Sequence, residues 1–456
     1  MGGCGVPFAD RLRSVKRTTL GQLTPVRALI AAQLAVIVAA GIATVLSLPK
    51  FTGDEIAHFS YLQSVAEEGR LPLLGPTLIS PQVEAIYEGT YPGPGRLDPA
   101  KRGLSGRSYE AFQPPLYYLL AAAPFRLAGG NYVVKMRVMR LVGLGLLLAA
   151  ALLLWRLTVE VINDPEEAEP YFAFALTALL WPGIVLRTVT ISNSGLEFLI
   201  GIGLTLVLWR AWQRRSVGWL IGAAALLGFG LLTRLTIIVF IPGLLICAFA
   251  VLRQAQISAR ARWLAGASVV VIPALIMAPW LLSNLDRYGS LTGSRVVRQL
   301  MEPFFNPDGI KYTVADIPSR LLVVTRAPLA EEWWIELLSA LKRWVLTVLM
   351  TALVVLAPLG VLSIKPSEQR TRLLVLLALP VGVGIIWMCY VLLVLNWDFF
   401  LPRYLYPTIP GLMLLAAVSL GRLRGGARAL LVGAAVMTIL LGAWWAYLAT
   451  VEPFTG

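Results

Sequence analysis

The stretch VRALIAAQLAVIVAAGIATVLSLPKFTGDEIAHF, residues 26–59, joins a long apolar run to a short polar segment. The run over 26–48 carries a single charged side chain, near its start, and its length suits a helix that crosses the hydrocarbon core of a membrane. Directly after it come Asp54, Glu55 and His58, and His58 is the only histidine of the chain. The sequence therefore predicts a spanning helix that delivers titratable side chains to the membrane surface.

The composition extends this prediction to the whole chain. Of its 456 residues, 57% are hydrophobic and only 14% are charged, whereas soluble domains carry about 25% charged residues. Alternating ten-residue strands are absent, which argues against a membrane barrel. We expect an all-α polytopic membrane protein with about eleven spans. The expected spans are 26–48, 138–159, 170–187, 195–212, 217–233, 235–252, 263–283, 344–364, 373–395, 404–421 and 428–448.

The short apolar segment 114–128 decides the topology. If it does not cross, five of the six cytoplasmic segments are basic, as the positive-inside rule requires. If it crosses, the later basic loops all face outward. We therefore expect 114–128 to lie at the outer surface, with the N-terminus inside and the C-terminus outside. The protein is then a multi-pass protein of the cytoplasmic membrane whose polar outer loops form an active site on the outer face.

These spans divide the chain into four parts. A basic cytoplasmic N-terminus, 1–25, precedes a transmembrane module, 26–283, which includes the outer loop 49–137. A second outer loop, 284–343, and the C-terminal helices, 344–456, follow. The net charge of +14 is assigned to topology and anionic membrane lipids, not to nucleic acid, because most basic residues lie in short loops between spans.

The first polar segment has two interpretations. Thr52 and Glu55 fit a capping box that starts a surface helix over 54–68. Alternatively, Asp54, His58 and Tyr61 share one helix face at i, i+4 and i+7, and a carboxylate there serves as a general base at the membrane boundary.

Two further polar stretches have the same ambiguity. In SYEAFQPPLYYLL, residues 108–120, Glu110, Gln113 and Tyr117 surround a helix start marked by two prolines, and either line a substrate or flank an interfacial helix. In LRTVTISNSGLEF, residues 186–198, Asn193 follows a basic residue at the outer ends of two spans. It either caps the next helix or binds substrate beside that cation.

Several basic residues lie on the outer side, against the usual bias. They either pair with outer acids or bind an anion, and arginine suits phosphate oxygens. A carboxylate at the membrane surface together with such cations fits one reaction, in which an acceptor hydroxyl attacks a sugar carried on a lipid phosphate. The candidate phosphate ligands are Lys135, Arg137, Arg187, Arg234 and Arg403.

The order of these motifs resembles that of the GT-C fold glycosyltransferases, in the bacterial branch related to protein O-mannosyltransferases and the lipid A aminoarabinose transferase. The resemblance covers about 26–421. It is carried by TGDEIAHFSYLQSVAEEGRLP (52–72), EAFQPPLYYLL (110–120), MRVMRLVGL (136–144), WPGIVLRTVTISNSGLEFLIG (181–201), LLTRLT (231–236), APWLLSNLDRYGS (278–290) and PRYLYPTIPGLMLL (402–415).

The resemblance implies a polyprenyl-phosphate sugar donor, a glycan, lipid or protein acceptor, and transfer with inversion. It implies that Asp54 is the catalytic base and Glu55 its paired acid. By the same resemblance, Arg234, Arg403 and Tyr404 contact phosphate or sugar.

Metal dependence stays open at this point. Relatives often carry an acid where this chain has Asn193, so a metal site would lose one anionic ligand here. His58, a candidate substrate contact, could compensate for that loss, and a divalent metal therefore remains a candidate cofactor.

Two other classes of function are consistent with the sequence. A transporter or flippase of lipid-linked sugars would place acids and bases inside the spans near the midplane, whereas here they concentrate at span ends. A non-catalytic membrane scaffold would tolerate the loss of Asp54 and Glu110.

Overall fold

The computed structural model describes residues 24–46, 51, 53–92, 98–254, 256–306, 309–320, 357, 359–362, 366–397, 402–423 and 425–451. In these ranges every regular element is a helix, and the one strand-like contact is an isolated bridge between Leu78 and Arg107. The predicted all-α class is therefore confirmed. The predictions for the N-terminal segment 1–25, for most of the span 344–364 and for the part of the second outer loop after 320 lie outside the described residues.

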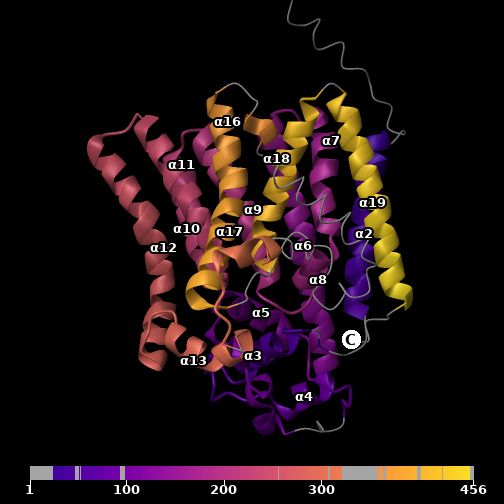
Figure 1. Cartoon of the computed structure of the whole chain (residues 1–456), viewed down its shortest axis with the longest axis vertical. Helices are drawn as coiled ribbons and strands as arrows, with labels where there is room; N and C mark the ends of the chain where they lie inside the picture. The colour runs from indigo at the N-terminus through magenta and orange to yellow at the C-terminus, as the bar shows by residue number, and fades with distance from the viewer. Residues whose placement is uncertain are drawn as a thin grey trace, which may run out of the picture.

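Long helices run side by side through the molecule (Figure 1). In the described ranges, eight are long and apolar enough to cross a membrane, so the chain is a multi-pass membrane protein. They are α2 (Pro25–Leu46), α6 (Tyr132–Ile162), α9 (Ser194–Gln213), η4 with α11 (Leu235–Phe240 and Ile241–Gln254), α12 (Ala259–Tyr288), α16 to α17 (Glu368–Leu373, Leu374–Ala378 and Leu379–Leu395), η8 with α18 (Pro402–Thr408 and Ile409–Gly421) and α19 (Gly426–Val451).

The predicted count of eleven spans is not confirmed. The segment expected as one span over 170–187 is broken into α7 (Pro165–Leu176) with η3 (Thr177–Leu180), and α8 (Pro182–Val189), which are bent by 67°. Trp181 is extended and Pro182 starts α8 at a position where its missing amide hydrogen costs nothing. The expected span 217–233 is α10 (Val217–Thr233), whose 17 residues are shorter than the other spans.

The helices of the first outer loop gather at one end of the bundle, called here the loop end (Figure 1). They are α3 (Glu55–Glu67), α4 (Pro81–Tyr87) and α5 (Leu116–Leu127). The 12 residues of α5 extend about 18 Å, too short for a hydrocarbon core of about 30 Å. Its length thus agrees with the prediction that 114–128 does not cross.

The predicted surface helix 54–68 is present as α3, but its predicted cap is wrong. Asp54 stands at the N-cap and makes no capping bond through its side chain. The Glu55 carboxylate pairs with Arg140 of α6, and Thr52, the other member of the predicted capping box, lies outside the described residues. The beginning of α3 is therefore fixed by a tertiary contact.

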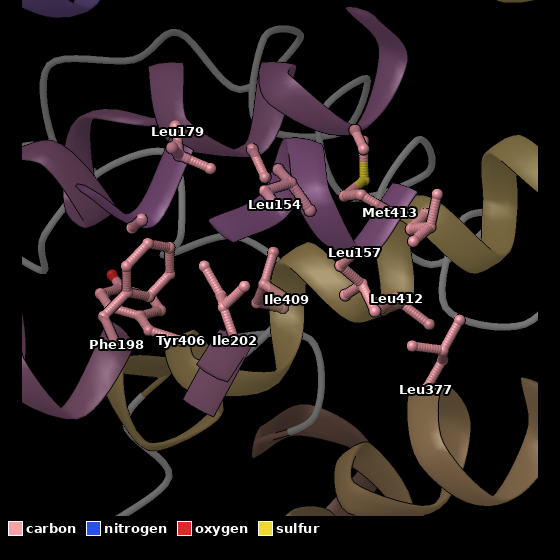
Figure 2. Close-up of a cluster of buried hydrophobic side chains, with 14 of the residues drawn as sticks. Leu154, Leu157, Leu179, Phe198, Ile202, Leu377, Tyr406, Ile409, Leu412 and Met413 are labelled. Carbon is pink, nitrogen blue, oxygen red and sulfur yellow. The ribbon is translucent and has the colours of Figure 1, made fainter. Parts of the chain in front are cut away.

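A buried apolar core holds α6, α9 and α18 together (Figure 2). Leu154, Ile202 and Met413 are among its members. Close packing also depends on Gly201 of α9, since a Cβ there would lie 2.7 Å from Pro407. This contact sets η8 directly against α9 at the loop end, where both carry polar side chains.

Candidate active site

Asp54 lies between α2 and α3 at the loop end, and three donors surround its carboxylate. Arg403 Nη1 lies 2.6 Å and Arg187 Nη1 3.4 Å from Oδ2, while the Tyr109 hydroxyl donates to Oδ1 at 3.2 Å. The preceding Gly53 has a φ of +51°, in the left-handed region that favours glycine. With 26% of its side chain exposed, Asp54 remains reachable from outside.

The charges around Asp54 fix its protonation state. Burial alone would raise its pKa, but the Arg403 and Arg187 guanidiniums outweigh burial and hold the pKa well below its ordinary value. Burial also lowers the pKa of His58 to about 3, so this imidazole is neutral near pH 7. Its Nδ1 pairs with the Tyr118 hydroxyl at 2.6 Å. With these contacts, Asp54 is ionised and His58 is neutral near pH 7.

Glu55, the neighbour of Asp54, is turned away into the protein. Arg140 donates to both of its oxygens, at 2.9 and 2.6 Å, and the Ile191 amide donates at 3.0 Å. The Glu55 and Arg140 side chains are only 1% and 0% exposed. Arg140 also donates to the Thr44 carbonyl of α2. We therefore assign Glu55 to the positioning of α3 rather than to contact with substrate.

A second carboxylate, Glu110, lies in the short helix η2 (Tyr109–Phe112) beside Gln113. Asn193 Nδ2 donates to Gln113 Oε1 at 3.3 Å and to the Thr233 carbonyl at 3.1 Å. Glu110 Oε2 and Asn193 Oδ1 are buried and accept no hydrogen bond from the described residues. Burial, assisted by the Asp54 charge, raises the pKa of Glu110 to about 6. Two acceptor atoms are therefore ready for hydroxyl donors of a ligand.

Arg234 lies at the end of α10 and is held firmly. Its Nη1 donates to Ser194 Oγ at 2.6 Å and to Glu197 Oε2 at 3.1 Å. The guanidiniums of Arg234 and Arg403 lie 5.5 and 5.6 Å from the centroid of the Tyr404 ring. Two cations from distant parts of the chain therefore share one aromatic ring.

The remaining predicted residues do not join this cluster in the same way. Lys135 pairs with Glu67 and lies over the rings of Phe125 and Tyr132. Arg137 is exposed on α6. Tyr117 is buried beside Tyr118, its ring edge-on to that neighbour. The structure thus brings Asp54, Glu110, Gln113, Arg187, Asn193, Arg234, Arg403 and Tyr404 to one end of the bundle, from segments far apart in the sequence.

Sequence reasoning missed two residues of the candidate site, Tyr109 and Tyr118, and it did not predict that Arg140 pairs with Glu55. Tyr109 donates to Asp54, Tyr118 holds His58, and Arg140 holds Glu55. Arg140 gave a usable signal, because an ionisable residue inside an apolar segment requires a partner. The two tyrosines had no such signal, since interfacial tyrosines are common in membrane proteins.

The described residues of the site do not fit a divalent metal. Among the described residues, no group of three or more His, Cys, Asp or Glu side chains could hold a metal ion. The partners of Asp54 are two guanidiniums and a protonated phenol that donate to the carboxylate, and in these forms they do not bind a metal. The proposed sugar transfer therefore involves no metal.

Residues 112–282 match the family described as dolichyl-phosphate-mannose-protein mannosyltransferase. This match confirms the resemblance to GT-C glycosyltransferases for that part of the chain. The matched segment contains Gln113, Arg187, Asn193 and Arg234, whereas Asp54 and Arg403 lie outside it. No curated protein matches the sequence.

Two solved structures are similar to most of this chain. ArnT from Cupriavidus metallidurans bound to undecaprenyl phosphate is 18% identical with a TM-score of 0.47, over 89% of this chain and 63% of that chain. The apo oligosaccharyltransferase of Archaeoglobus fulgidus is 13% identical with a TM-score of 0.47, over 91% and 56%. The chain therefore spans less than two thirds of the length of these structures.

Proposed function

We propose that the protein is an integral membrane glycosyltransferase of the GT-C type, which moves a sugar from a polyprenyl-phosphate donor to an acceptor hydroxyl. The observation that carries this proposal is the meeting of Asp54 with Arg187 and Arg403, close to Arg234, at the ends of spanning helices. A carboxylate next to several guanidiniums provides both a base and an anion site at the membrane boundary. The family match over 112–282 supports a lipid-phosphate donor.

The proposed reaction is a single displacement with inversion. The acceptor oxygen attacks the anomeric carbon, and the bond from that carbon to the phosphate oxygen breaks. The acceptor proton passes to Asp54, and the polyprenyl phosphate leaves with one additional negative charge. Arg403, Arg187 and Arg234 stabilise this charge, and arginine provides the matching fork of donors.

The sugar is proposed to contact the second polar group of the site. Glu110 and Asn193 carry the two buried acceptor atoms, and Gln113 links their elements. Sugar hydroxyls are donors, and they would satisfy acceptors that are costly to leave unpaired. Tyr117, Tyr404 and His58 are proposed as surrounding contacts.

The site is proposed to face outward. The loops at the opposite end of the bundle carry exposed arginines, and the positive-inside rule places such loops in the cytoplasm. The exposed arginines are Arg214, Arg215, Arg260, Arg262, Arg422 and Arg428. The loop end, with Asp54, then faces away from the cytoplasm.

A donor panel tests this proposal. The purified protein in nanodiscs is offered different polyprenyl-phosphate sugars together with envelope extract as acceptor, and release of free polyprenyl phosphate is measured. We expect release from one donor class, and chelator should not change it. Movement of intact lipid-linked sugar across the membrane without release would support a transporter instead.

A further inference from the structure

The ion pairs at the loop end differ in exposure, and the pair of Arg234 with Glu197, with side chains 9% and 2% exposed, lies between two extremes. The pair of Arg140 with Glu55 is sealed, with 0% and 1% of the side chains exposed. In the pairs of Asp54 with Arg187 and Arg403, by contrast, both arginine side chains are 18% exposed and the Asp54 side chain 26%. A ligand that enters the site can therefore reach the Asp54 pairs but not the Glu55 pair.

The ion pairs of Asp54 with Arg187 and Arg403 use groups that the proposed reaction needs elsewhere: the carboxylate as a base and the guanidiniums as phosphate ligands. A general base needs a free carboxylate oxygen, but Arg403 and Arg187 both approach Asp54 Oδ2 and Tyr109 covers Oδ1. Phosphate binding needs guanidinium donors, but one nitrogen of each guanidinium, Nη1 of Arg403 and Nη1 of Arg187, is directed at Asp54. With these pairs in place Asp54 is a poor base, since two guanidiniums at Oδ2 stabilise its ionised form.

We propose that Asp54 is masked by Arg403 and Arg187 until the donor phosphate takes over these two guanidiniums, so that the donor must bind before the acceptor hydroxyl can be deprotonated. This inference rests on the proposed function. The phosphate supplies the anion that Arg403 and Arg187 lose when they leave Asp54, and no charge is left unpaired. With the arginines withdrawn, the pKa of Asp54 rises toward its ordinary value and the carboxylate can accept a proton.

Arg234 provides the fixed point for this exchange. Glu197 and Ser194 hold its guanidinium, and Glu197 also accepts a bond from Thr236. Arg403 and Arg234 both lie within 5.6 Å of the Tyr404 ring, so the two guanidiniums border one region, which we propose the phosphate occupies. Arg234 therefore anchors the donor, and Arg403 and Arg187 exchange partners.

The exchange has a direct thermodynamic consequence. If Asp54 and the phosphate compete for the same guanidiniums, removal of the Asp54 charge must strengthen phosphate binding. The probe is undecaprenyl phosphate, which lacks the sugar, and its affinity is measured for the full chain in nanodiscs. Asp54→Asn should bind it about tenfold or more tightly than wild type, because a charged hydrogen bond no longer competes.

The control is Glu110→Gln, which removes a nearby buried negative charge that makes no ion pair with Arg403 or Arg187 among the described residues. It should strengthen binding by less than about threefold if general electrostatics alone acts on the phosphate. In the double variant Asp54→Asn/Arg403→Gln the gain should disappear. An unchanged or weaker affinity of Asp54→Asn, or an equal gain in Glu110→Gln, overturns the masking.

The outcomes separate this inference from the proposed function. If neither wild type nor Asp54→Asn binds the lipid phosphate, the proposed donor class is wrong, and the masking proposal is then wrong as well. Asp54→Asn should fold, because its side chain makes no capping bond to α3. If it does not, product-inhibition kinetics of wild type decide the question: compulsory order with donor first supports the masking, and random order overturns it.

Discussion

Arg403 Nη1 lies 2.6 Å from Asp54 Oδ2, although the two residues are 349 positions apart in the sequence. The first outer loop and the beginning of η8 therefore close one site together. Gly201 permits this closure, because it lets η8 lie against α9. The contact joins the strongest sequence candidate for a base to a residue proposed as a phosphate ligand.

Loss of the sealed pair should destabilise the fold. Glu55→Gln leaves the buried Arg140 guanidinium without its counterion, which costs about 3–5 kcal/mol in buried pairs. The matched variant Glu68→Gln breaks the exposed pair with Arg70 and should cost less than about 1 kcal/mol. Thermal unfolding in detergent measures both. Equal unfolding temperatures for the two variants would contradict the structural role of Glu55.

Stability should depend on pH through Glu110. Its pKa is raised to about 6 from an ordinary 4.5, so the folded state binds more protons than the unfolded state between these values. The stabilisation present below pH 4.5 is therefore lost as the pH rises through 6. The unfolding temperature of wild type, minus the unfolding temperature of Glu110→Gln, should decrease as the pH rises from 4.5 to 6. A flat difference would show that Glu110 titrates normally.

Arg234→Gln should raise the KM for the donor by about ten- to a hundredfold, because it removes one or two charged hydrogen bonds to the phosphate. The effect should appear in kcat/KM for the donor, whereas kcat/KM for the acceptor at saturating donor changes less. Arg137→Gln, an exposed arginine on α6, is the control and should leave both unchanged. Similar losses in the two variants would point to a general effect of surface charge.

The backbone before Asp54 should matter for turnover. Gly53 has a φ of +51° and Gly69 a φ of +67°, so alanine costs about 1–2 kcal/mol of strain at either position. Only Gly53 adjoins Asp54, and we expect Gly53→Ala to reduce turnover severalfold while Gly69→Ala does not. Turnover and unfolding temperature, measured together, separate the two effects. If Gly69→Ala lost as much turnover as Gly53→Ala, the proposed role of Gly53 in placing Asp54 would be wrong.

Much of the architecture follows from hydrophobic runs and loop charge. The spans are apolar enough to be recognised one by one, and the charge of the loops alone indicated that 114–128 does not cross. The break at Trp181 was missed, because the apolar composition continues through it. Pro182 marks the break, but prolines also occur within continuous spans, as in α12.

The sequence predicted most of the residues that meet at the candidate site, but it did not predict which of them form ion pairs with one another. Asp54, Arg187, Arg234 and Arg403 were expected at the outer ends of spans, and the structure brings them together. The separation of Asp54 from Glu55 was not predictable, because adjacent residues at a helix start point in different directions and only the fold places Arg140 beside one of them. Lys135 was expected at the phosphate, but it forms an ion pair with Glu67 instead.

The central claim is that Asp54 is the base of a sugar transfer, and one rate comparison tests it most directly. Single-turnover transfer is measured with saturating donor and acceptor for wild type and Asp54→Asn, after equal yield and unfolding temperature have been established. We predict that Asp54→Asn binds the donor lipid phosphate but transfers the sugar about 10²- to 10⁴-fold more slowly, the usual contribution of a general base. Transfer by Asp54→Asn at the wild-type rate would contradict the account.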